Sequence, residues 1–75
     1  MSKAEIAQAL DNLLRLRNVS YSMGSRLIDD LGMDSYEVVA LMIELETILD
    51  RELDEGMQVF FAESTVGEIC ARLAD

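Results

Sequence analysis

The stretch LGMDSYEVVALMIELE, residues 31–46, decides the fold of this 75-residue chain. Asp34, followed three residues later by Glu37, has the spacing of a capping box, in which each side chain satisfies a backbone N–H group of the first helical turn. The pattern predicts a helix that begins at Asp34 or Ser35 and runs to about Arg51. Because Asp34 alone can cap this helix, the hydroxyl of Ser35 remains free for another role.

Apolar residues recur along this predicted helix at the three- and four-residue spacing of one helix face. They are Val38, Leu41, Met42, Leu45, Ile48 and Leu49. The face is too broad for a single stripe beside water, so either the helix is central or part of its apolar surface meets a partner. We expect Leu45, and also Leu31 ahead of the helix, to be core residues.

Two further helices and one short helical segment are predicted around it. Ser2 with Glu5, and Thr65 with Glu68, repeat the capping-box spacing. The first pair opens a helix over about residues 3–17, and the second opens the last helix. Their apolar stripes are Ile6, Leu10, Leu13 and Leu14, and Val66, Ile69, Cys70 and Leu73. Residues 53–63 are expected to form a short turn that buries Val59 and either Phe60 or Phe61.

Residues 18–33 show no helical or strand period and are predicted to form a long loop. Its expected apolar anchors are Leu27, Ile28 and Leu31, with the acids at positions 29 and 30 in solvent. The whole chain, residues 1–75, is therefore predicted to be a single all-α domain. We expect a small four-helix bundle with three main helices, one short helix and a long first loop.

The net charge of the chain limits the kinds of molecule that it can bind. Fifteen acidic residues and six basic ones give a formal net charge of −9. Such a charge repels nucleic acid and anionic membranes and favours partners with basic patches. The sequence shows neither a secretion signal nor an apolar run of membrane-spanning length. We therefore expect a cytoplasmic monomer that binds neither nucleic acid nor membrane.

The residues available for catalysis are few. The chain has no histidine, which excludes a Ser-His-Asp arrangement, and Cys70 has no imidazole to activate it. The alternating acids of residues 50–54 do not continue as a calcium loop, because Glu55 and Phe61 stand where such a loop needs glycine and glutamate. We expect no metal site and no enzymatic activity.

Ser35 is the exception, since a hydroxyl at a helix start lies near free backbone amides and the positive end of the dipole. The motif Leu31-Gly32-Met33-Asp34-Ser35-Tyr36 resembles the Leu-Gly-x-Asp-Ser-Leu motif of the acyl and peptidyl carrier proteins. VVALMIELE, residues 38–46, looks like that family's second helix. STVGEI, residues 64–69, looks like the entry into its last helix. The resemblance covers nearly the whole chain.

This resemblance implies a four-helix bundle that carries a covalent 4′-phosphopantetheine on Ser35. The thiol of that arm would hold acyl groups as thioesters, so the protein would be a non-catalytic carrier. Asp34 would help a phosphopantetheinyl transferase hold its metal ion and coenzyme A. The apolar interior of the bundle could shelter a short acyl chain.

The chain departs from the family pattern at three positions. Tyr36 replaces the usual leucine, and Ala40 and Thr47 stand where fatty-acid carriers often have glutamate. These differences favour a carrier of acyl intermediates in specialised, polyketide-type biosynthesis such as antibiotic production. Two alternatives stay open: an aminoacyl or peptidyl carrier, and an unmodified carrier-like helical module that only binds a partner.

One face of the predicted second helix is a candidate contact surface. This docking face consists of Tyr36, Ala40, Ile43 and Thr47, which follow helical spacing. Glu37 and Glu44 stand at its edge, so the face combines an apolar centre with a charged rim. We expect acyl-loading and acyl-processing enzymes with basic or apolar patches to dock there.

Overall fold

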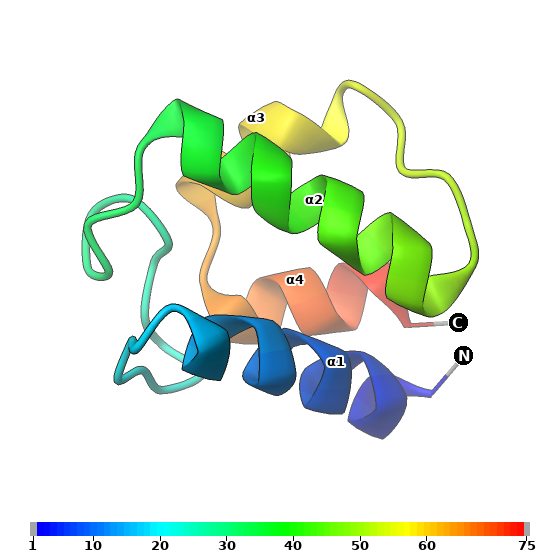
Figure 1. Ribbon diagram of the computed structural model, residues 1–75, viewed down its shortest axis with the longest axis horizontal. Helices are drawn as coiled ribbons and strands as arrows, with labels where there is room; N and C mark the ends of the chain where they lie inside the picture. Colours follow the sequence, from blue (N-terminus) through cyan, green and yellow to red (C-terminus); the bar gives the residue numbers. More distant parts are fainter. Residues whose placement is uncertain (1, 75) are drawn as a thin grey trace.

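Four helices are formed by residues 2–74, the part of the chain that this computed structural model describes. They are α1 (Lys3–Leu16), α2 (Ser35–Leu49), α3 (Met57–Glu63) and α4 (Val66–Leu73). α1 lies beside α4 and also packs on α2, and the short α3 packs on α2 (Figure 1). The predicted all-α bundle with one short helix is confirmed. None of these helices is long and apolar enough to cross a membrane.

Three of the helices begin with the predicted capping boxes. The side chains of Ser2, Asp34 and Thr65 each accept a hydrogen bond from the backbone N–H three residues on, at 3.2, 2.9 and 3.1 Å. In all three, the glutamate at that third position accepts a bond from the cap residue's own N–H. The helix starts therefore follow from local hydrogen bonding alone.

Two helices end earlier than predicted. α1 stops at Leu16, one residue early, and α2 stops at Leu49, two residues before Arg51. At the end of α2, Asp50 takes the left-handed conformation with φ 52°. The Arg51 N–H then donates to the Glu46 carbonyl at 3.2 Å, which satisfies one of the last carbonyl groups of the helix.

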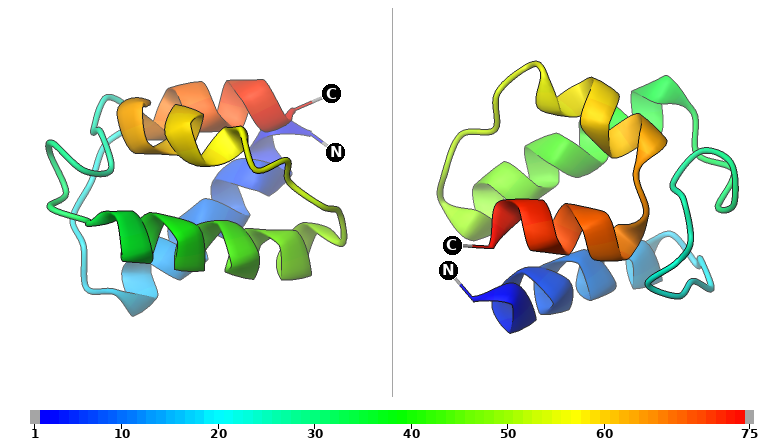
Figure 2. Two further views of the ribbon diagram at one scale, coloured as in Figure 1. Left: turned by 90° about the horizontal axis from the view of Figure 1, so that it is seen from above. Right: turned by 180° about the vertical axis from the view of Figure 1, so that it is seen from behind.

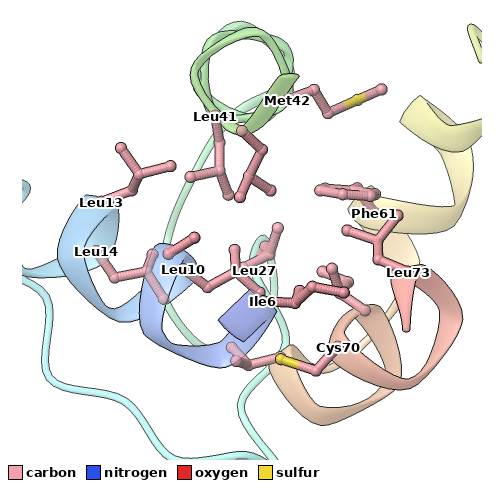
Figure 3. Packing of buried hydrophobic residues seen from close by; sticks show 14 of the residues in the cluster. Ile6, Leu10, Leu13, Leu14, Leu27, Leu41, Met42, Phe61, Cys70 and Leu73 are labelled. Carbon is pink, nitrogen blue, oxygen red and sulfur yellow. The ribbon is translucent and has the colours of Figure 1, made fainter. Parts of the chain in front are cut away.

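All four helices contribute to one apolar core, and Figure 3 shows Phe61 of α3 beside Leu73 of α4. Five of the six residues of the predicted apolar face of α2 are buried, namely Val38, Leu41, Met42, Leu45 and Leu49. The sixth, Ile48, is 48% exposed, so part of this face is uncovered. The neighbouring helices therefore cover only part of the apolar surface of α2.

The short helix α3 also differs from its prediction. Phe61 is fully buried as one of the expected alternatives, but Val59 is 63% exposed, so its predicted burial is wrong. Phe60 is half-buried under the guanidinium of Arg72, which lies 5.4 Å from the ring centroid. α3 packs with only one side against α2, which leaves Val59 on the solvent side.

The long loop between α1 and α2 is held by two buried anchors, Leu27 and Met33. The Met33 N–H donates to the Leu27 carbonyl at 3.1 Å, which closes a turn whose two ends point inward. Ile28 and Leu31 lie between these ends and are only half-buried at the edge of the core. The prediction that Leu31 is a core residue is therefore wrong, and Met33 takes that role.

The loop also binds the start of α4. The N–H groups of Val66 and Gly67 donate to the carbonyls of Ser25 and Met23, both at 2.9 Å. A Cβ atom at position 67 would lie 3.1 Å from the Met23 carbonyl oxygen, so glycine permits this close approach. The loop thus lies at the end of the bundle opposite the start of α1 and the end of α4 (Figure 2).

A second contact fastens the loop to α1. The Tyr21 hydroxyl donates to the Asp11 carboxylate at 2.6 Å, and Arg15 forms an ion pair with the same carboxylate at 2.8 Å. Burial, followed by this hydrogen bond, raises the pKa of Tyr21 to about 12. The hydrogen bond from Tyr21 lowers the pKa of Asp11. The bond therefore needs a neutral phenol and an ionised carboxylate.

Removing the Tyr21 hydroxyl should loosen the loop. We expect Tyr21→Phe to lower the Tm by about 4–8 °C near neutral pH, the shift that corresponds to one hydrogen bond in a domain of this size. A phenol whose pKa is raised on folding stabilises the fold below the unfolded pKa of about 10, and this contribution is lost as the pH rises to about 12. Thermal unfolding of both chains between pH 6 and 12 should show the difference shrinking above pH 10. A difference that persists unchanged to pH 12 would contradict the assignment.

The core is tested at Leu45, whose side chain is fully buried. Leu45→Ala should cost about 2–5 kcal/mol, which is comparable to the whole stability of a domain this small. Ile48→Ala removes a similar volume from a half-exposed site and serves as the control, with a cost below about 1 kcal/mol. Urea denaturation followed by circular dichroism measures both. Equal costs would show that the two residues are equally buried in solution.

Candidate functional site

Ser35 is the first residue of α2, and its side chain is exposed. The Asp34 carboxylate accepts the Glu37 N–H at 2.9 Å, while the Asp34 N–H donates to the Glu37 carboxylate at 3.5 Å. The cap therefore consists of Asp34 and Glu37. Within residues 2–74 the Ser35 hydroxyl makes no hydrogen bond, as predicted from the sequence.

The backbone around Ser35 suits an anionic group. The first N–H groups of a helix have no partner within the helix, so those of Ser35 and Tyr36 face outward at the positive end of the α2 dipole. A phosphate on the Ser35 oxygen would lie beside these donors. The carboxylate of Asp34 is close by, bound to the Glu37 N–H.

Gly32 shapes the approach of the chain to this site. Its φ is +72°, a left-handed conformation that residues with a Cβ adopt only at a cost. No atom lies within 4 Å of a Cβ built at this position, so the requirement for glycine comes from the backbone alone. Gly32 lies within the turn between Leu27 and Met33, two residues before the cap residue Asp34.

Shallow grooves follow α2 from Ser35 to the connection with α3. The groove beside Ser35 and Tyr36 shares Val39 and Gln58 with the next groove. That groove in turn shares Ile43 and Glu46 with a third, which ends at residues 50–52. Because neighbouring grooves share lining residues, they lie side by side along α2, and we call this row of grooves the α2 furrow.

The predicted docking face is uncovered in the structure. Tyr36 is 88% exposed and Ile43 57% exposed, and Ala40 and Thr47 are exposed as well. The Thr47 hydroxyl donates to the Ile43 carbonyl at 3.2 Å within α2. The geometry therefore brings the four residues together on one accessible surface, and docking at this surface stays a prediction.

The two acids expected at the rim of this face have partners within the protein. Glu37 belongs to the capping box of α2, and Glu44 is half-buried in an ion pair with Arg17. The Arg17 guanidinium also donates to the Leu13 carbonyl at 3.1 Å, which holds it against the end of α1. The negative charge of Glu44 is therefore largely offset.

Two residues near Ser35 were not predicted from the sequence. Val39 and Gln58 line the groove beside the hydroxyl, and Gln58 comes from α3. Gln58 is exposed and belongs to no motif, so its place near Ser35 depends on how α3 packs on α2. Val39 follows Ser35 by four residues and so lies on the same face of the helix, and this spacing could have identified it from the sequence.

The chemistry of the site is that of an exposed hydroxyl beside backbone donors. The chain contains no histidine, and residues 2–74 hold no cluster of acids and cysteine arranged to bind a metal ion. Cys70 lies in the core, where burial raises the pKa of its thiol. No family model, curated protein or solved structure matches the chain in comparisons with known proteins.

The backbone at Gly32 can be tested by substitution. Gly32→Ala should destabilise the protein by about 1–2 kcal/mol, because alanine disfavours the left-handed conformation. Gly32→Asn should cost less, since asparagine tolerates that conformation better. Urea denaturation of the three chains provides the measurement. If asparagine costs as much as alanine, the backbone conformation is not the reason for glycine here.

Proposed function

We propose that the protein is a non-catalytic carrier that bears 4′-phosphopantetheine on Ser35. The observation that carries this proposal is an exposed serine hydroxyl at the start of α2 that makes no hydrogen bond within residues 2–74 and directly follows the aspartate that caps the helix. Local stability does not require a hydroxyl at position 35. A modification there would leave the capping bonds of α2 intact.

The residues around Ser35 fit the proposed group. The N–H groups at the start of α2 would face the phosphodiester, and the α2 furrow offers a surface along which the arm can lie. Gln58 supplies an exposed amide beside that path. When bound, the group would supply a thiol that holds cargo as a thioester, while the protein positions it.

The interior of the bundle is one place where the proposed cargo could lie. Phe61 and Leu73 are almost fully buried where α3 and α4 meet (Figure 3). The resemblance implies that a short acyl chain could lie in the apolar interior of the bundle, and the grooves along α2 offer a second place for it at the surface. We propose that the cargo is an acyl intermediate of a specialised, polyketide-type pathway. The carrier would work in the cytoplasm as a monomer.

The proposed partners are a phosphopantetheinyl transferase and enzymes that load and process the acyl group. Asp34 would assist the transferase, since its carboxylate lies at the surface next to Ser35. An aminoacyl or peptidyl carrier needs the same geometry. The unmodified binding module is favoured by one observation, the highly exposed Tyr36 in place of the family's leucine.

Intact-protein mass spectrometry tests the modification. After incubation with coenzyme A, Mg²⁺ and a broad-specificity transferase, the wild type should gain the mass of one phosphopantetheine group. Ser35→Ala should gain none and keep its helicity, because the Asp34 cap remains. Ser20→Ala, on the exposed loop, is the matched control and should be modified like the wild type. A wild type that gains no mass with several transferases would favour the binding module.

A further inference from the structure

One side chain of α2 holds the connection between α2 and α3. The carboxylate of Glu46 is half-buried and accepts the Leu53 N–H at 2.8 Å. The backbone carbonyl of Glu46 accepts the N–H groups of Asp50 and, at 3.2 Å, of Arg51. Within residues 2–74, no other side chain of α2 forms a hydrogen bond or ion pair with this connection. Glu46 therefore fixes the chain where it leaves the helix.

The hydrogen bonds of the connection link Leu53 to the first turn of α3. The Met57 N–H donates to the Asp54 carbonyl at 2.9 Å. The Gln58 N–H donates to the Glu55 carbonyl at 3.1 Å. These bonds close one turn directly after Leu53, and the last residue of that turn is Gln58. The position of Leu53 therefore determines where Gln58 lies.

α3 has few other contacts that could set the position of its first turn. The helix has seven residues, and its N-cap residue Gly56 supplies no side-chain hydrogen bond. Phe61, in the second turn, is the one buried residue of α3, while Met57 at its start is half-buried. The bond to Glu46 is charge-assisted, which makes it roughly twice as strong as a neutral hydrogen bond. The place of Gln58 therefore depends on this bond.

We propose that Glu46 is a positioning residue for the groove beside Ser35. Its carboxylate holds Leu53, the turn after Leu53 places Gln58, and Gln58 lines that groove together with Val39. Without the bond, Gln58 would no longer have a fixed place beside the hydroxyl. The use of the groove by a phosphopantetheine arm rests on the proposed function, whereas the position of Gln58 does not.

Three variants of the unmodified protein test the hydrogen bond. Glu46→Ala removes the acceptor, and Glu46→Gln keeps a neutral one. Glu52→Ala is the matched control, because it removes an exposed acid that lines the furrow and makes no hydrogen bond within residues 2–74. In amide hydrogen exchange, Glu46→Ala should speed exchange of the Leu53 N–H at least about tenfold, the factor for a bond to a charged group. Glu46→Gln should speed it less, and Glu52→Ala should leave it unchanged.

NMR spectra of the same variants separate a positioning role from general destabilisation. In Glu46→Ala the amide signals of Gln58 and Ser35 should move, while exchange in α1 and α4 stays as in the wild type. Faster exchange throughout all four helices would overturn the proposal, because Glu46 would then only stabilise the fold. Unmoved Gln58 signals would overturn it as well. Glu46→Gln gives the same readout with a side chain of the same shape, so the test does not depend on the alanine variant folding.

The modified protein connects this positioning to the proposed function. When phosphopantetheine is added to the wild type, the side-chain amide signals of Gln58 should shift, and this shift should be lost in Glu46→Ala. Shifts of equal size in the two chains would overturn the role of Glu46 at the site. A wild type that gains no mass would refute the proposed function alone, since the exchange measurements use the unmodified protein.

Discussion

The reciprocal hydrogen bonds between Asp34 and Glu37 are the constraint on which the site depends. They set the first residue of α2 and satisfy donors that would otherwise be unpaired at the end of the longest helix. Because Asp34 fills the cap position, Ser35 becomes the first helical residue and its hydroxyl faces solvent. A helix starting one residue later would make Ser35 the cap and occupy that hydroxyl.

The same helix also organises the core and the surface. Its buried stripe, centred on Leu41 and Leu45, packs toward the other helices, so its remaining faces must lie outside. The α2 furrow follows that outer side from Ser35 to Glu52. The proposed attachment site at Ser35 and the proposed contact surface for partner enzymes would therefore lie on one rigid helix. That helix keeps the distance between them constant.

Charge in this acidic protein is sorted by the fold rather than spread evenly. Arginines pair with acids beside α1 and in the long loop, as Arg17 does with Glu44 and Arg26 with Asp29. The connection between α2 and α3 keeps its acids unpaired within the described residues. Residues 50–56 contain four acids and one arginine, so this connection carries a formal charge of −3 of the total of −9, and a basic partner would be attracted to it.

The sequence by itself determined the features that depend on local interactions. Capping spacing placed the starts of α1, α2 and α4, and it identified Ser35 as a hydroxyl released by Asp34. Tertiary structure decided the features that depend on distant neighbours: Met33 rather than Leu31 in the core, the exposure of Ile48 and Val59, and Gln58 beside Ser35. The physical reason is that caps join residues three apart, whereas burial and ion pairing depend on which segments fold against each other.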